Sequence, residues 1–181
     1  MNIFVTGRAG LGKTTVIRRA VEELDGMGYR HGGICTPEIR VNGARVGFRI
    51  IDLATGKSGI LAHVNNPSGP KIGHYRVNLY DVQAIGVNAI REAIKNADYI
   101  VIDEVGPMEL LSKEFRDAVL SAVECPKPVL GALHWKRRDW LLKEVKDKYD
   151  VRIHRITPQN RESLHRTLVE EIVKSIEGVG H

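Results

Sequence analysis

The feature that most constrains this chain is an octapeptide near its first residues that fits the pattern G-x-x-x-x-G-K-[ST]. It reads Gly7-Arg8-Ala9-Gly10-Leu11-Gly12-Lys13-Thr14. A short apolar run, residues 3–5, precedes it, and a segment with helical periodicity, residues 15–24, follows it. This order of strand, loop and helix is typical of a P-loop, whose glycines let backbone N–H groups surround phosphate at a helix N-terminus.

The P-loop pattern assigns roles to individual side chains. We expect Lys13 to reach the β- and γ-phosphates of a nucleotide and the Thr14 hydroxyl to ligate Mg²⁺. Together with Thr15, the octapeptide forms the first part of the predicted nucleotide-binding site. The alternative is a glycine-rich turn that binds nothing, and the strand and helix on either side of the loop argue against it.

A pair of acidic residues forms the second part of the predicted site. Residues 99–102 are a continuous apolar run, typical of a strand buried on both faces of a parallel sheet, and Asp103 and Glu104 follow it. Ligands of open α/β sheets bind at the carboxyl ends of strands, so we expect Asp103 beside the P-loop as a Mg²⁺ ligand. Glu104 would orient the attacking water as the catalytic base. The alternative is a solvated strand end. The predicted nucleotide contacts here are Ile102, Asp103, Glu104, Val105 and Gly106.

Two further polar residues are weaker candidates. His134 ends another apolar run, residues 129–133, which is expected to neighbour one of the two strands above. It would act in catalysis by sensing the γ-phosphate or orienting water, and the alternative is a half-buried histidine at a strand end. Arg161 would contact a phosphate or the base, and the alternative is a surface arginine at the start of a helix capped by Asn160. The other histidines share no spacing that indicates a metal site.

Strand-like and helix-like segments alternate along most of the chain, which predicts an α/β fold with a parallel sheet flanked by helices. We expect one domain, residues 1–181. Within it, about residues 40–79 have a different pattern of short β-branched runs and turn signals, which predicts an antiparallel β-hairpin insertion. The other expected strands are 33–36 and 151–156, and the expected helices are 82–94, 111–123, 140–148 and 164–176.

Composition limits the classes of binding partner and the cellular compartment that we expect. The chain has 27 Lys and Arg against 22 Asp and Glu, a net charge of +5, which suits polyphosphate substrates. The densest basic stretch, residues 136–148, is interleaved with acidic residues and reads as a solvated helix face, so nucleic acid is not indicated. Two cysteines without metal-site spacing read as reduced, partly buried thiols. With no signal peptide and no apolar run of transmembrane length, we expect a cytoplasmic monomer without membrane contact.

The nucleotide base is expected to be recognised loosely. Asp103-Glu104-Val105-Gly106 also fits the D-x-x-G pattern of GTPases. The chain contains no N-K-x-D sequence, which would read guanine in a GTP-specific switch.

Several strings together resemble one family, the THEP1-type nucleoside-triphosphatases. They are the P-loop, residues 36–40, residues 46–53, residues 103–110 with the sequence D-E-V-G-P-M-E-L, residues 128–134, and residues 157–161. The acidic string is the most specific. Arg8 is a departure, because family members often have proline there. The resemblance implies a RecA-like (ASCE) core with a β-hairpin insertion, and Mg²⁺-dependent hydrolysis of several nucleoside triphosphates to diphosphate and phosphate.

Two other functions remain open at the level of sequence. A P-loop kinase for nucleotides or small molecules also needs Mg²⁺, and Arg40, Arg45 and Arg49 of the insertion would serve in its lid. The acidic pair favours water as the nucleophile instead. A nucleic-acid-linked ATPase is compatible with the net charge, but no pattern of interleaved basic and aromatic residues supports it.

Overall fold

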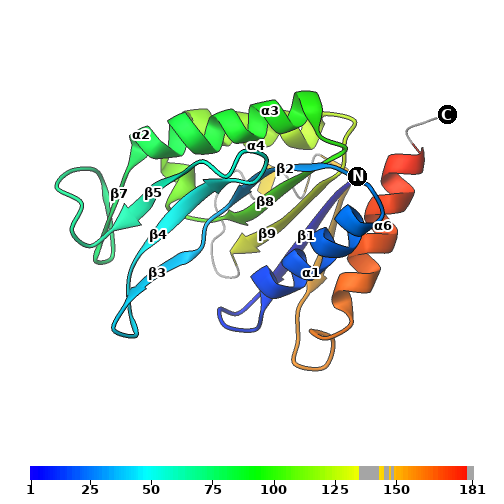
Figure 1. Cartoon of the computed structure of the whole chain (residues 1–181), viewed down its shortest axis with the longest axis horizontal. Helices are drawn as coiled ribbons and strands as arrows, with labels where there is room; N and C mark the ends of the chain where they lie inside the picture. Colours follow the sequence, from blue (N-terminus) through cyan, green and yellow to red (C-terminus); the bar gives the residue numbers. More distant parts are fainter. Residues whose placement is uncertain (135–142, 145–146, 148, 179–181) are drawn as a thin grey trace.

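A central sheet lies between two layers of helices in the computed structural model, which describes residues 1–134, 143–144, 147 and 149–178. In Figure 1, α1 (Lys13–Gly26) and α6 (Leu164–Gly178) cover one face of the sheet. The other face is covered by α2 (Leu79–Asp81), a π-helical segment (Val82–Val87), α3 (Asn88–Asn96) and α4 (Lys113–Glu124).

The sheet has a parallel core of five strands. In spatial order these are β10 (Val151–Arg155), β1 (Asn2–Gly7), β9 (Val129–His134), β8 (Tyr99–Val105) and β2 (His31–Cys35). Each neighbouring pair in this series is parallel. The central strands are apolar along their length because helices bury both of their faces. The predicted α/β class with a parallel sheet flanked by helices is therefore confirmed.

The β-rich insertion continues the same sheet in antiparallel fashion. Its first long strand, β4, pairs with β2, and the sheet then runs through β5, β7 and β6, while β3 pairs with β4. Asn42 and Gly43 connect β3 to β4 with φ of 50° and 79°, as the tightest hairpin turns require. The strands are β3 (Glu38–Val41), β4 (Ala44–Asp52), β5 (Ser58–His63), β6 (Lys71–Ile72) and β7 (Tyr75–Val77). The predicted antiparallel insertion is confirmed.

Two hydrophobic clusters hold the layers together, one on each face of the sheet. Ile17 of α1 and Leu168 of α6 pack against Val5 of β1 in the first cluster. Ile90 of α3 and Phe115 of α4 pack against β8 in the second. All five side chains are at most 2% exposed. The core therefore lies on both sides of the strands whose ends form the site.

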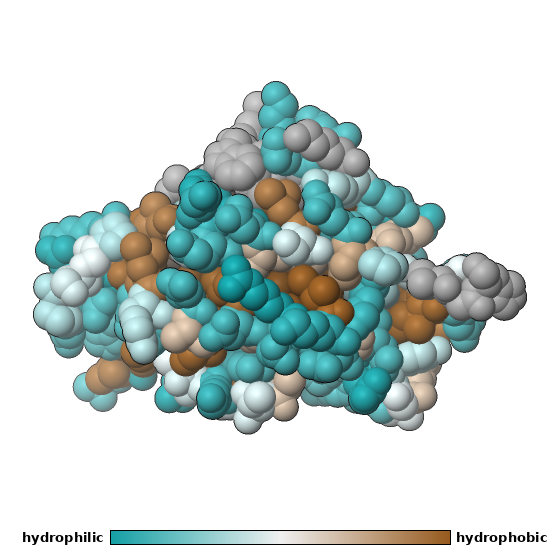
Figure 2. Space-filling model, turned by 90° about the horizontal axis from the view of Figure 1, so that it is seen from above, coloured by the Kyte–Doolittle hydropathy of each residue, from teal (hydrophilic) through white to brown (hydrophobic). Residues whose placement is uncertain are grey.

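Seen from the side of α2 and α3, the surface is mainly hydrophilic, with scattered hydrophobic residues (Figure 2).

Some expected boundaries need correction. Asn160 does not cap α6, which begins at Leu164. Its side chain instead accepts a hydrogen bond from the Thr157 amide at 2.8 Å and donates one to the Arg155 carbonyl at 2.9 Å. It thus shapes the turn after β10, because asparagine pairs readily with the backbone nearby. The expected helix 140–148 and the basic stretch lie largely outside the described residues. No helix among the described residues is long and apolar enough to cross a membrane.

Both cysteines have the environment that the sequence indicated. Cys35 and Cys125 are free and half-buried. Burial, with the neighbouring charge of Asp103, raises the pKa of the Cys35 thiol to about 11. A thiol that stays protonated at neutral pH is a poor nucleophile and metal ligand, so Cys35 acts as a packing residue.

Candidate nucleotide site

The P-loop connects β1 directly to the N-terminus of α1. Gly10 and Gly12 have φ of 82° and 99°, a backbone conformation that residues with a Cβ rarely adopt. Gly12 lies immediately before α1, and its carbonyl accepts the first helical bond, from the Val16 amide at 2.9 Å. The loop therefore turns at its glycines so that the free amides of the helix end face the cleft above the sheet.

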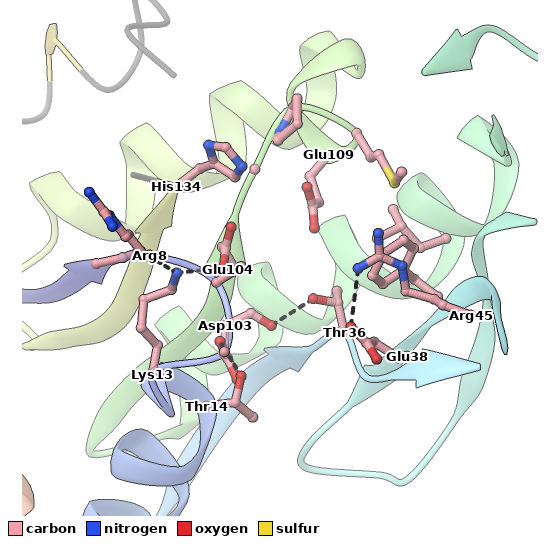
Figure 3. Close-up of a pocket in the computed structure, with 18 of the residues that line it drawn as sticks. Arg8, Lys13, Thr14, Thr36, Glu38, Arg45, Asp103, Glu104, Glu109 and His134 are labelled. Atoms are coloured by element: carbon pink, nitrogen blue, oxygen red, sulfur yellow. Dashed lines mark hydrogen bonds and ion pairs between the residues drawn. The ribbon is translucent and has the colours of Figure 1, made fainter. Parts of the chain in front are cut away.

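Lys13 lies between the loop and the acidic pair (Figure 3). Its Nζ donates to the Gly7 carbonyl at 2.7 Å and is 4.0 Å from Glu104 Oε2. The two side chains are 11% and 27% exposed. The ammonium group is thus held at the mouth of the loop by a backbone carbonyl, with a carboxylate beside it that can accept a proton or orient a water molecule.

Thr14 and Asp103 meet across the cleft although they are far apart in the sequence. Thr14 Oγ1 donates to Asp103 Oδ1 at 3.5 Å, and the Asp103 carbonyl accepts from Thr36 Oγ1 at 3.0 Å. Asp103 is only 5% exposed. Burial, and next the charge of Glu104, raise the pKa of Asp103 to about 6, while Thr14 and Lys13 oppose the rise. A divalent cation would reverse this effect by favouring the charged carboxylate.

A break in strand register lets both acidic side chains face the cleft. Ile102 of β8 is opposite Gly131 of β9, whereas Val105 is opposite Leu133. Asp103 and Glu104 therefore face a single β9 residue, which is the pattern of a β-bulge. In a regular strand, consecutive side chains point to opposite faces. The bulge removes that alternation at the acidic pair, and both carboxylates line the same cleft.

His134 lies between the two motifs. Strand β9 pairs with both β1 and β8, and His134 is in register with Gly7 at the start of the P-loop. The expectation that its strand neighbours one of the two motif strands is thus met for both. Its Nδ1 is buried, with no hydrogen-bond partner among the described residues. The side chain lines the cleft, so it is placed to contact a ligand there.

The cleft above the carboxyl ends of the strands has a volume of about 990 Å³. Most of the predicted site residues line it, as expected for ligands of open α/β sheets. Two others, Ile102 and Val105, are 0% and 1% exposed and belong to the core. Their side chains are therefore not available to a nucleotide, because both flank the bulge and face the packed helices.

Arg161 is on the other side of the P-loop. With Leu11 and Thr15 it lines a smaller hollow of about 150 Å³ beside the first turn of α1. Its Nε is 3.7 Å from Glu162 Oε1, and Glu162 also pairs with Arg19 at 2.9 Å. The structure thus places Arg161 near the loop but not in the main cleft.

The structure also brings residues to the cleft that we did not assign to it from the sequence. Most of them lie in residues 36–40 and 103–110, two of the segments that resemble the family, so the sequence did mark these segments. Of the three insertion arginines considered for a lid, only Arg45 lines the cleft. The added residues are Thr36, Glu38, Arg45, Phe48, Leu61, Pro107, Met108 and Glu109.

Glu109 is the most deeply buried of the added carboxyl groups, at 4% exposure. Burial raises its pKa to about 8 from the usual 4.5. Protonated Glu109 therefore stabilises the fold at low pH. This contribution is complete below pH 4.5 and is lost as the pH rises to about 8, because over this range the carboxyl group ionises in the unfolded chain but not yet in the folded protein.

We expect Glu109→Gln, which keeps the shape without the charge, to be more stable than the original protein at pH 9 and equal to it at pH 4. A gain of about 1 kcal/mol would raise the midpoint of thermal unfolding by roughly 2–4 °C. Circular dichroism melts across this range would measure it, with the exposed Glu170→Gln as control. A difference between Glu109→Gln and the original protein that is the same at every pH would contradict the assignment.

Comparison with known proteins agrees with this geometry. The family model described as NTPase matches residues 2–172. The chain is 42% identical to Nucleoside-triphosphatase THEP1 of Thermofilum pendens over 176 residues, covering 97% of both chains. The crystal structure of THEP1 from Aquifex aeolicus superposes with a TM-score of 0.82 at 33% identity, covering 95% of this chain and 99% of that one.

A human protein has the same fold. The solution structure of a human cancer-related nucleoside triphosphatase superposes with a TM-score of 0.80 at 31% identity, covering 94% of this chain and 96% of the human one. The family model, the curated relative and both solved structures extend over nearly the whole chain, insertion included. The matches include the P-loop, the acidic strand and the insertion, and this chain therefore belongs to the NTPase family.

Proposed function

We propose that this protein is a Mg²⁺-dependent nucleoside-triphosphate phosphohydrolase that converts NTP and water to NDP and phosphate with little preference for the base. The observation that carries the proposal is the meeting of Lys13, the Thr14–Asp103 pair and Glu104 at one end of the cleft. The names of the relatives, nucleoside-triphosphatase, support it.

In this proposal the loop binds and orients the substrate. The amides of residues 8–14 surround the phosphates, and Lys13 places its charge where negative charge gathers in the transition state. Phosphoryl transfer leaves little covalent chemistry to the protein, so positioning supplies most of the rate enhancement. Glu104 orients the water molecule toward the γ-phosphorus and accepts its proton. His134 is placed to contact the γ-phosphate or the same water.

The Thr14 and Asp103 oxygens suit Mg²⁺, which prefers hard oxygen ligands and usually keeps several waters alongside one or two carboxylates. The Thr14 and Asp103 oxygens are 3.5 Å apart and both face the cleft, which suits two ligands of one metal ion. Bound there, Mg²⁺ would neutralise charge on the β- and γ-phosphates. All the residues in these roles come from one chain, which is the reason to propose that a monomer is active.

We expect ATP, GTP, CTP and UTP to be hydrolysed with kcat/KM values within about tenfold of one another, which is roughly 1.4 kcal/mol of discrimination. The reasons are the lack of an N-K-x-D sequence and the small hollow at Arg161, which offers few side chains to a base. Phosphate release measured with each nucleotide tests this. Chelation of Mg²⁺ with EDTA should abolish release, and added Mg²⁺ should restore it.

Either of two results would count against the proposal. Undiminished release in EDTA would remove the metal from the mechanism. A preference of three orders of magnitude for one nucleotide would show that a dedicated base pocket exists.

A further inference from the structure

The main cleft has two halves with different walls. The first half holds the P-loop, Lys13 and the Mg²⁺ ligands. In the second half, Thr36, Glu38 and Arg45 come from the β2–β3 connection and the insertion strands, on the far side of Asp103 and Glu104 from Lys13 (Figure 3). Phe48 and Leu61 of the insertion and Met108 add an apolar surface to this second half.

A nucleoside triphosphate bound as proposed above does not need the second half. Lys13 reaches the β- and γ-phosphates, so the γ end lies at Lys13 and Glu104. The loop and the first turn of α1 hold the phosphates nearer the ribose, and the hollow at Thr15 and Arg161 lies beside that turn, on the opposite side of the loop. The ribose and base therefore extend from the phosphates in the direction away from the insertion. The second half begins where the nucleotide ends.

Arg45 has several partners in the second half. Its guanidinium lies over the rings of Phe48 and Tyr75, with the carbon 5.2 and 5.7 Å from the ring centroids. Its Nε donates to the Tyr75 hydroxyl at 2.9 Å, and one NH group donates to Glu38 at 3.2 Å. These two bonds use two of the five N–H donors of the group. A planar ligand can stack on such a pre-organised guanidinium and accept from its other donors.

The charges around the second half favour an uncharged ligand. Glu38 already balances Arg45, and Glu104 and Glu109 face the same space. With a nucleoside triphosphate in the first half, an anionic ligand would meet the Glu104 carboxylate and the phosphates. A second cation would lie against Arg45. A neutral molecule avoids both electrostatic repulsions. Burial of its flat surface against the apolar wall of Phe48, Leu61 and Met108 is favourable.

We propose that the second half of the cleft is a separate ligand site for an uncharged, nucleoside-like molecule, a planar heterocycle that carries a carbonyl beside an N–H group. The carbonyl accepts from Arg45, the N–H donates to a wall carboxylate, and the ring lies on the Arg45–Phe48 stack. The proposal rests on the proposed function, because it takes the first half to hold the nucleoside triphosphate.

The test uses the whole chain saturated with Mg²⁺ and the ATP analogue that has an imido bridge between the β- and γ-phosphorus atoms, which resists hydrolysis and occupies the first half. Guanosine and uridine are then added as probes, and binding is followed by saturation-transfer NMR. We expect both to bind with Kd below about 1 mM. The charged probes GMP and UMP should bind at least fivefold more weakly. Equal or tighter binding of the monophosphates would overturn the neutral-ligand assignment.

Two arginines of the hairpin give a matched pair of variants. Arg40 and Arg45 both pair with Glu38, at 2.8 and 3.2 Å, but only Arg45 lines the cleft. Arg45→Ala should raise the Kd of the nucleosides about tenfold, whereas Arg40→Ala should leave it within twofold. If Arg45→Ala lowers the thermal midpoint markedly, Met108→Ala takes its place, with a rise of at least threefold expected.

The outcomes separate this proposal from the proposed function. A protein that binds the ATP analogue and hydrolyses NTP, but binds neither nucleoside, would overturn the second site and leave the hydrolase proposal standing. A protein that does not bind the analogue would overturn both. Equal effects of Arg40→Ala and Arg45→Ala would also overturn the second site, since only one of these side chains reaches it.

Discussion

Lys13→Ala is expected to abolish nucleotide hydrolysis, with kcat lower by about 10²-fold or more, while the fold is retained. The magnitude is that of removing one preorganised electrostatic group from the position where transition-state charge develops. Lys13 Nζ is held at the mouth of the loop by the Gly7 carbonyl at 2.7 Å and is 4.0 Å from Glu104. Alanine preserves the helix and removes the charge. Phosphate release under saturating NTP and Mg²⁺ measures the loss.

A lysine away from the cleft provides the control. Lys95 is 68% exposed on α3 and pairs with Glu92, so Lys95→Ala should hydrolyse NTP at the original rate. Circular dichroism should show the same secondary structure and a similar thermal midpoint for both variants. If a folded Lys13→Ala protein keeps near-full activity, the P-loop is not the phosphate site of this enzyme.

Glu104→Gln should separate hydrolysis from binding. Glutamine keeps the size of the side chain but removes the negative charge that orients water and accepts its proton. We expect kcat to fall by about 10²-fold or more, within the range that a positioned general base contributes. Thr14 and Asp103 would still hold the metal, and Lys13 and the loop amides would still hold the phosphates. Isothermal titration should therefore find NTP affinity changed by less than a few-fold.

Asp103→Asn provides the opposite signature. Asp103 is 5% exposed and its Oδ1 is 3.5 Å from the Thr14 hydroxyl, so loss of the carboxylate charge should weaken binding of Mg²⁺–NTP itself. The two neighbouring substitutions would thus differ in which step they affect. Normal turnover by Glu104→Gln would refute its role as base, and His134, whose buried Nδ1 lies at the same end of the cleft, would become the next residue to replace.

Local patterns in the sequence were enough for the P-loop and the parallel sheet. Glycine positions, the lysine and threonine that follow, and the change from an apolar run to helical spacing are properties of neighbouring residues, so residues 3–24 could be interpreted alone. The same holds for the apolar strand before Asp103 and for the turn signals of the insertion. A strand buried on both faces must be apolar, whatever its partners.

Long-range pairing decided the rest. Strand β9 lies between β1 and β8, which puts His134 beside Gly7, and no local pattern states that order. The bulge that turns both Asp103 and Glu104 into the cleft arises from the register of β8 against β9. The second half of the cleft exists because β4 pairs with β2 and carries Arg45 and its neighbours over the strand ends. Such contacts join residues far apart in the chain, where register and packing, rather than propensity, determine which side chains meet.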